Sequence, residues 1–316
     1  MPERTALLDQ SGRPGASTQR PSPIGLPFGL LRTARPRQWV KNGLVVAAPA
    51  AAGELFSRGA LTQLALVFAL FTAAASAIYL INDARDAEAD RAHPQKRHRP
   101  VAAGQVPVSV SYVTGGLLAV LAPTAAAFLC TPMTAALLAA YVGMQLAYCI
   151  SLKHVLVVDL VVVTTGFLMR AMIGGVALEI PLSRWFLITT GFGALFVVSA
   201  KRYSEAVNME GKNGATRALL TEYTTGYLRF VWQLAAGVSV LAYCLWAMES
   251  RGFTDATLLP WRQLSMVAFI LAVLRYAVFA DRGSAGAPED VILRDPPLAL
   301  IALAWLTLFG LQVAEL

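Results

Sequence analysis

The chain has 316 residues, of which 56% are hydrophobic and only 14% charged, against roughly 25% charged in an ordinary soluble domain. This composition argues against a water-soluble globular protein and predicts one whose apolar surface faces lipid. The formal net charge of +7 is in principle compatible with nucleic-acid binding, but basic residues clustered between apolar runs are the usual signal of membrane topology. We therefore expect no nucleic-acid partner.

The first 25 residues are rich in Pro, Gly, Ser and charged side chains and lack the apolar core of a signal peptide. Such a composition predicts a disordered tail, followed by a single transmembrane domain over residues 26–316. The three cysteines, Cys130, Cys149 and Cys244, have no paired spacing. They indicate neither a disulfide framework nor a zinc site.

Apolar runs of about 20 residues, the length that crosses a bilayer as an α-helix, recur along the rest of the chain. Backbone amides in hydrocarbon must be paired within the protein, and the runs lack the alternation of a β-barrel. We therefore predict an all-α, polytopic membrane bundle of about nine helices. The predicted spans are roughly 38–56, 61–81, 108–129, 132–151, 155–178, 184–200, 228–248, 261–280 and 297–314.

The distribution of Lys and Arg predicts the orientation of this bundle. With the N-terminus in the cytoplasm, nearly all basic residues fall on the inner side, and the outer loops carry only Arg58, Arg184, Arg251 and Arg262. This asymmetry follows the positive-inside rule. Carboxylates contribute little to orientation, so the acidic residues near the inner helix ends need another explanation.

A basic segment leads into the first predicted span, in the sequence RPRQWVKN at residues 35–42. Trp39 is typical of an anchor at the membrane interface. Lys41 and Asn42 follow as polar groups at the mouth of the span. We predict that both contact a polar substrate at the inner side of the membrane.

Acidic residues gather where the second span ends, in the sequence NDARDAEAD at residues 82–90. If the helix continues through this stretch, Asp83, Asp86 and Asp90 lie at i, i+3 and i+7 and share one face, with Asn82 beside Asp86. Hard oxygen ligands in this number suit Mg²⁺, which commonly bridges carboxylates to substrate phosphates. The alternative interpretation is a solvated, charged loop between two spans.

A basic cluster follows immediately, in the sequence HPQKRHRP at residues 93–100. Lys and Arg bind the outer oxygens of a diphosphate whose remaining charge a metal neutralises. The acidic and basic stretches together therefore predict a site for a metal diphosphate, with Lys96 and Arg99 as phosphate ligands.

Two further inner helix ends carry polar residues. Lys153 lies in the turn before the fifth span, and Asp159 lies about one helical turn inside that span, where a lone acid is costly and by default a functional candidate. Arg170, deeper in the same helix, either faces the bundle interior or pairs with another polar group. The sixth span ends in a second polar group, made of Lys201, Arg202, Tyr203 and Glu205.

These motifs together resemble the UbiA-type prenyltransferase superfamily, intramembrane enzymes of nine helices whose first acidic motif has the form NDxxDxxxD. The similarity lies in RPRQWVKN, NDARDAEADRAHPQKRHRP, SLKHVLVVD and KRYSE and covers nearly the whole chain after the tail. It is strongest to the branch that transfers 5-phosphoribosyl from phosphoribosyl pyrophosphate to a polyprenyl phosphate such as decaprenyl phosphate. The resemblance implies a Mg²⁺-dependent pentosyltransferase of the plasma membrane that supplies precursors of arabinose-containing cell-wall polymers.

The resemblance also implies roles for individual residues. Asp83 and Asp86 would hold Mg²⁺, with Asp90 as a further ligand, and Asp159 would contact the ribose. The second DxxxD motif common in the superfamily is incomplete here, because Val163 stands four residues after Asp159. We predict substrate contacts from Lys41, Asn42, Asn82, Lys96, Arg99, Lys153, Lys201, Arg202, Tyr203 and Glu205.

Two other functions are compatible with parts of the sequence. A conventional intramembrane prenyltransferase would take a prenyl diphosphate as donor, and its metal site would look the same in sequence. A transporter would carry charged residues near the membrane midplane, whereas here they cluster at one face. Small residues such as Gly174 and Gly175 allow close packing either within the bundle or between copies in a homo-oligomer.

Overall fold

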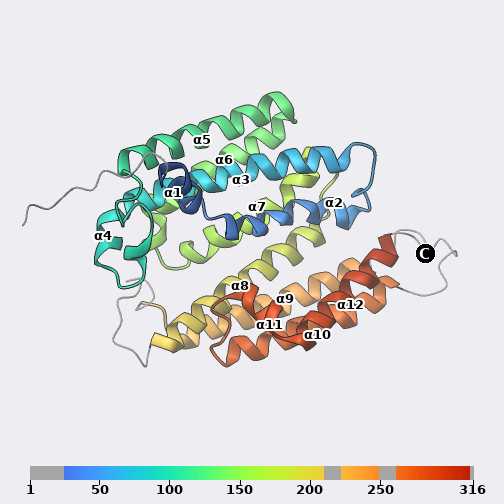
Figure 1. The fold of residues 1–316 in the computed structure, drawn as a ribbon. Helices are drawn as coiled ribbons and strands as arrows, with labels where there is room; N and C mark the ends of the chain where they lie inside the picture. The colour runs from blue at the N-terminus through green and yellow to red at the C-terminus, as the bar shows by residue number, and fades with distance from the viewer. Residues whose placement is uncertain (1–24, 210–221, 249–260, 314–316) are drawn as a thin grey trace, which may run out of the picture.

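The computed structural model describes residues 25–209, 222–248 and 261–313, and every regular element in these ranges is helical (Figure 1). The all-α architecture predicted from the sequence is confirmed, whereas the predicted N-terminal tail lies almost entirely outside the described residues. The elements are α1 Gly25–Thr33, η1 Pro36–Val46, α2 Ala47–Ala52, α3 Ala60–Arg85, α4 Ala87–Ala92, η2 Lys96–His98, α5 Val108–Leu129, α6 Pro132–Ile150, η3 Leu152–His154, α7 Val158–Ala177, α8 Arg184–Met209, α9 Thr225–Met248, α10 Trp261–Asp281, α11 Pro288–Arg294 and α12 Pro296–Val313.

Six of the described helices are long and apolar enough to cross a membrane: α3, α5, α6, α7, α9 and α10. Three further segments coincide with the remaining predicted spans. These are α8, which carries a charged inner end, the 18-residue α12, and η1 together with α2. Each of the nine predicted spans therefore corresponds to a helical segment, and the protein is a multi-pass membrane protein.

The first predicted span is not an ordinary α-helix. It consists of an 11-residue 3₁₀-helix, η1, followed by the six residues of α2. A 3₁₀-helix rises about 2.0 Å per residue and an α-helix about 1.5 Å, so Pro36–Ala52 would measure about 31 Å if straight. The 3₁₀ winding makes this segment longer than the same number of residues in an α-helix, although its first residues, which include Arg37 and Lys41, are polar.

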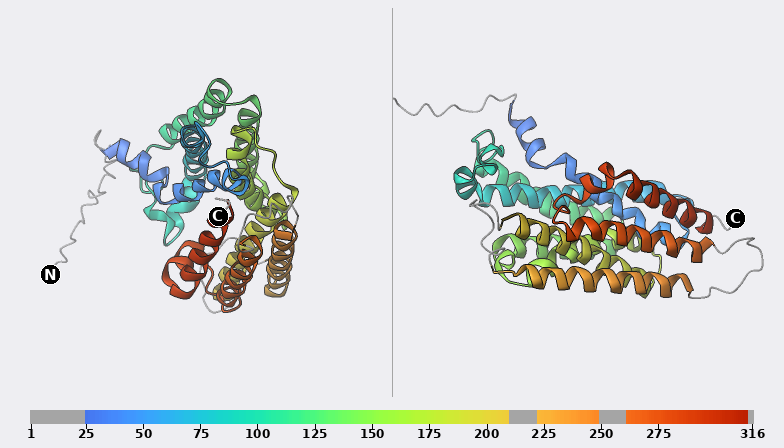
Figure 2. Two further views of the ribbon diagram at one scale, coloured as in Figure 1. Left: turned by 90° about the vertical axis from the view of Figure 1, so that its right-hand side faces the viewer. Right: turned by 90° about the horizontal axis from the view of Figure 1, so that it is seen from below.

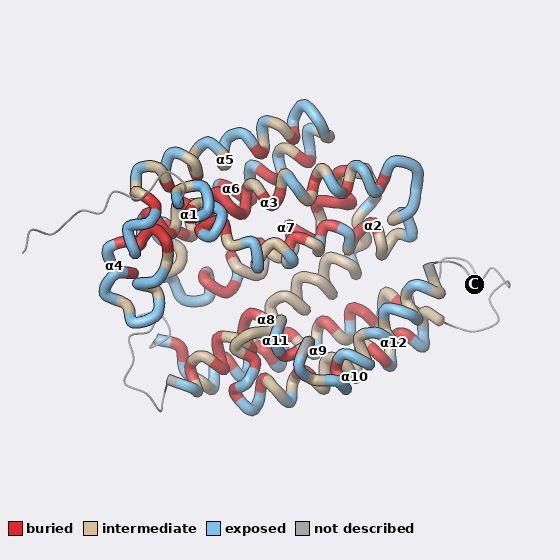
Figure 3. Tube along the Cα trace, in the orientation of Figure 1, coloured by how far each residue is buried: buried red, intermediate tan, exposed pale blue. Residues whose placement is uncertain are grey.

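Helix α7 lies at the centre of the bundle, between two apolar cores (Figure 2). Its Met169 and Ile173 pack into a core shared with η1, α3, α5 and α6, whereas Leu160 packs into a second core with α8, α9 and α10. In α3 and α7, 56% of the most apolar window is buried, against 22% in α5 and α10. Figure 3 shows the resulting exposed outer sides, which are the surfaces that lipid would cover.

Two glycines of α7 allow the first span to approach closely. A Cβ atom at Gly174 would lie 1.9 Å from the Val45 carbonyl oxygen of η1, and one at Gly175 would lie 2.9 Å from the Ala48 Cβ atom of α2. Of the two uses expected for these small residues, the structure shows packing within the bundle. The backbone of η1 is thereby fixed against the central helix.

Replacement of Gly174 by Ala should destabilise the protein, because the clash is with a backbone carbonyl that no rotamer change can move. We expect a cost of about 1–3 kcal/mol or more, visible as a lower melting temperature in detergent. Gly143→Ala is the matched control, since its added Cβ meets no atom within 4 Å on the exposed side of α6. An equal effect of both variants would contradict this account of the packing.

Candidate active site

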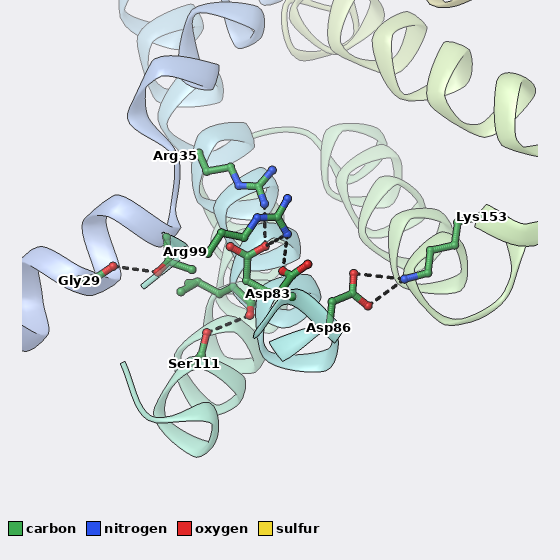
Figure 4. A network of polar contacts seen from close by, with 10 residues as sticks. Gly29, Arg35, Asp83, Asp86, Arg99, Ser111 and Lys153 are labelled. Atoms are coloured by element: carbon green, nitrogen blue, oxygen red, sulfur yellow. Dashed lines mark hydrogen bonds and ion pairs between the residues drawn. The ribbon is translucent and has the colours of Figure 1, made fainter. Parts of the chain in front are cut away.

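The polar residues predicted from the second span lie at one end of the bundle, where α3 leads into α4 and η2 (Figures 1 and 4). Asp83, on the last turn of α3, is 2% exposed and accepts hydrogen bonds from Arg35 at 2.6 Å and from Arg99 at 3.2 Å. The same Arg99 nitrogen donates to Asp90 at 2.7 Å. The Arg99 guanidinium thus joins Asp83 and Asp90, the first and last of the three acids predicted to share one helix face.

Asp86, the middle acid, points to a different partner. Its two carboxylate oxygens accept from Lys153 Nζ at 2.9 and 3.3 Å (Figure 4). The prediction of one continuous helix through residue 90 is wrong, because α3 ends at Arg85 and α4 begins at Ala87. The backbone of Asp86, with φ −87° and ψ 3°, leaves the helical region between them, and the three carboxylates do not form a single stripe.

Arg35 is a site residue that the sequence analysis did not select. It precedes Pro36 in the left-handed region, at φ 57°, which is uncommon for any residue other than Gly. Its guanidinium contacts Asp83 and lies 4.8 Å from the Tyr79 ring centroid. In the sequence it counted only as one basic residue among several before the first span, and no local signal distinguishes it from Arg32 or Arg37.

Asp159 forms a second, separate group with the end of α8. It is 2% exposed and accepts from Tyr148 at 2.5 Å and from Arg202 Nε and Nη2 at 3.2 and 3.3 Å. Arg202 also donates to Glu205 at 3.0 Å. The buried pair of Asp159 and Arg202 joins α7 to α8, so it connects the two halves of the bundle.

Arg170 lies deeper and has neutral partners. It donates to Asn42 Oδ1 at 3.0 Å, to Tyr141 Oη at 2.8 Å and to the Gly166 carbonyl at 2.7 Å. Asn42 in turn donates to Thr72 at 3.0 Å. Because the Asn42 amide is 2% exposed and bonded to protein on both sides, its contacts are those of a link between η1, α3 and α7.

The other predicted substrate ligands have less definite surroundings. Tyr203 is buried, and its hydroxyl accepts a hydrogen bond from Arg229. The remaining candidates are half-buried: Lys41 in η1, Asn82 in the last turn of α3, Lys96 in η2 and Lys201 in the C-terminal part of α8. The structure therefore places the three acids of the motif in two neighbouring ion-pair groups: Arg99 joins Asp83 to Asp90, and Lys153 pairs separately with Asp86. The Asp159 group lies apart from both.

In these two ion-pair groups the number of negative charges equals the number of positive charges. Asp83, Asp86 and Asp90 are matched by Arg35, Arg99 and Lys153. Within the described part of the chain, no three acidic, His or Cys side chains converge on one point. Carboxylate oxygen is nevertheless the donor type that Mg²⁺ prefers, and a magnesium diphosphate would offer both charges at once, the metal for the carboxylates and phosphate oxygens for the cations.

Solved structures share this fold. The chain superposes with a TM-score of 0.65 on a digeranylgeranylglyceryl phosphate synthase, at 15% identity over 92% of this chain and 99% of the other. It superposes equally well, also at 0.65, on a UbiA homologue from Archaeoglobus fulgidus bound to GPP and Mg²⁺, at 14% identity over 91% of this chain and all of the other. At such low identity these similarities show the fold alone.

Sequence comparison is more specific. The UbiA prenyltransferase family model matches residues 43–291. The chain is 48% identical to decaprenyl-phosphate phosphoribosyltransferase of Mycobacterium tuberculosis, over 92% of this chain and 96% of that protein. It is 46% identical to the protein of the same name from Corynebacterium glutamicum, over 96% and 90%. The chain therefore belongs to the UbiA prenyltransferase family.

Proposed function

We propose that this protein is a decaprenyl-phosphate phosphoribosyltransferase. It transfers 5-phosphoribosyl from phosphoribosyl pyrophosphate to decaprenyl phosphate and releases pyrophosphate, as a step toward arabinan precursors of the cell wall. The proposal is supported by the name and near-complete coverage of the similar mycobacterial and corynebacterial proteins. The structural observation that carries it is the presence of three acids and three matching cations, in two neighbouring ion-pair groups, at one end of the bundle.

These two groups of paired acids and cations suit a donor that carries a diphosphate. The acceptor phosphate is already anionic at neutral pH, so the reaction needs no strong base, and the barrier lies in breaking the anomeric bond to pyrophosphate. Mg²⁺ held by Asp83 and Asp86, with Asp90 near them, would supply electrostatic stabilisation of the leaving group. Arg35, Arg99 and Lys153 would then bind phosphate oxygens in place of the carboxylates.

In this proposal Asp159 positions other side chains of the site and does not contact the substrate. Both of its oxygens are bonded to Tyr148 or Arg202, which favours a positioning role over the direct ribose contact predicted from the sequence. By holding Arg202, it orients the inner end of α8. The neighbouring Lys201 is half-buried, whereas Tyr203 packs against Trp232 in the core between α8 and α9.

The orientation of the protein is part of the proposal. The two ion-pair groups lie at the end of the bundle that carries most Lys and Arg residues, and the positive-inside rule assigns that end to the cytoplasm. We place the protein in the plasma membrane, with its N-terminus and active site on the cytoplasmic side. The polyprenyl chain would remain in lipid beside the bundle while its phosphate reaches the inner end.

A transfer assay with purified protein tests the donor. With Mg²⁺ and decaprenyl phosphate, ¹⁴C-labelled phosphoribosyl pyrophosphate should yield a labelled lipid, and EDTA should abolish the product until Mg²⁺ is restored. A parallel reaction offers a labelled prenyl diphosphate with aromatic acceptors. Label entering a lipid only in that second reaction would replace the proposal with a conventional prenyltransferase, and solute flux into liposomes without any product would indicate a transporter.

A further inference from the structure

The turn that leads into α7 is strained at Val157. This residue has φ 67° and ψ −46°, and the Val158 N–H donates to the Leu156 carbonyl at 2.7 Å. The pattern is that of the rare γ-turn with a positive φ, and a β-branched residue with positive φ is a true outlier. The Val157 side chain is 48% exposed, so packing of that side chain does not account for the conformation.

Tyr223 supplies the restraint from a distant part of the chain. Its hydroxyl oxygen accepts a hydrogen bond from the Val157 N–H at 2.7 Å, although 66 residues separate the two positions. The Tyr223 ring is buried and stacks on Tyr227, with 5.8 Å between ring centroids. Burial raises the pKa of the Tyr223 phenol, more than the bond from Val157 lowers it, so the group is neutral at physiological pH.

The strained turn lies between two residues of the candidate site. Lys153, in η3 just before the turn, binds Asp86, and Asp159, in the first turn of α7, binds Arg202. Only a few residues separate Lys153 from Asp159, so the backbone path at Val157 sets the spacing of their side chains. Strain of this kind persists only where surrounding contacts determine the conformation.

We propose that Tyr223 is a positioning residue that holds the Val157 turn, so that Lys153 and Asp159 keep the spacing seen in the structure. A purely structural alternative is that the bond only tethers the start of α9, with no effect on the turn. The consequence for turnover rests on the proposed phosphoribosyl transfer. The consequence for the turn itself does not, because it concerns the conformation of residues 155–159 in the free protein.

Hydrogen–deuterium exchange of the full-length protein in detergent measures the turn directly. Tyr223→Phe removes the acceptor of the Val157 N–H, so a peptide covering residues 155–159 should exchange at least about 10-fold faster. Tyr227→Phe is the matched control, because it removes a neighbouring hydroxyl but keeps the stacked ring and the Val157 contact. Unchanged exchange in Tyr223→Phe, or the same acceleration in both variants, would overturn the proposal.

A double-mutant cycle with Val157→Gly tests the link to the site. Gly adopts a positive φ without strain, so the turn in this variant depends less on Tyr223. Tyr223→Phe should lower kcat about 10-fold with a smaller change in donor KM in the wild-type background, and much less in Val157→Gly. An equal effect in both backgrounds would reject the positioning role. If exchange responds as expected but no protein in the series transfers phosphoribosyl, the proposed function fails and the restraint on the turn stands.

Discussion

Replacing Asp86 with Asn should lower turnover at least about 100-fold, the scale seen when one preorganised electrostatic group is removed from an active site. Asn keeps the shape of the side chain but cannot bring a full negative charge to Mg²⁺. The fold should survive, because the Asp86 and Lys153 side chains are 28% and 22% exposed, so loss of this partly buried pair should cost less than the ~3–5 kcal/mol of a fully buried one. The measurement is phosphoribosyl transfer at saturating donor, with melting temperature as the check on folding.

Glu88→Gln is the matched control for this experiment. It removes a carboxylate two residues away in α4, from an exposed position, so a general loss of negative charge at the inner face would affect both variants alike. We expect near-normal turnover and Mg²⁺ dependence in Glu88→Gln. Near-normal turnover with unchanged Mg²⁺ dependence in Asp86→Asn would refute the metal assignment, whatever the donor proves to be.

Breaking the buried pair of Asp159 and Arg202 should have the largest effect on stability. Their side chains are only 3% and 8% exposed, and removal of one partner leaves the other charge buried and under-compensated, which typically costs about 3–5 kcal/mol. Asp159→Asn should therefore lower the melting temperature clearly and also reduce turnover, because α8 loses its attachment to α7 at the inner end.

The double variant Asp159→Asn with Arg202→Gln separates charge compensation from catalysis. Neutralising both partners removes the uncompensated charge, so the melting temperature should recover in large part relative to Asp159→Asn alone. Turnover should remain low if the ion pair orients the polar end of α8. Full recovery of turnover together with stability would show that the pair serves folding alone, and no stability loss in Asp159→Asn would contradict the buried geometry.

The positions of the membrane segments could be predicted because they depend on local properties. The length of an apolar run reports a span directly, and each predicted span corresponds to a described helical segment. The winding of the first span could not be predicted. Its Val45 packs closely against Gly174, in a helix more than a hundred residues further along the chain, and no pattern within residues 36–46 predicts that contact.

In the acidic motif, too, local sequence predicts some properties and contacts between distant segments decide the others. Its residue types and its place at the inner end of a span were sufficient to predict a site for a metal diphosphate. The pairing of its members was not predictable, because the cations come from three separate positions along the chain. Asp83 meets Arg35 from before the first span, Asp86 meets Lys153 from before α7, and Arg99 joins Asp83 to Asp90.

By itself, the sequence determined the spans, the helix ends at which the charged residues gather and, through its motifs, the family. Those properties follow from composition and spacing within short stretches. Only the tertiary structure decided that Arg35 pairs with Asp83, that Arg170 is bonded to neutral groups, and that the Tyr223 hydroxyl accepts a hydrogen bond from Val157. Each of these is a contact between distant segments, and such contacts depend on how the helices pack.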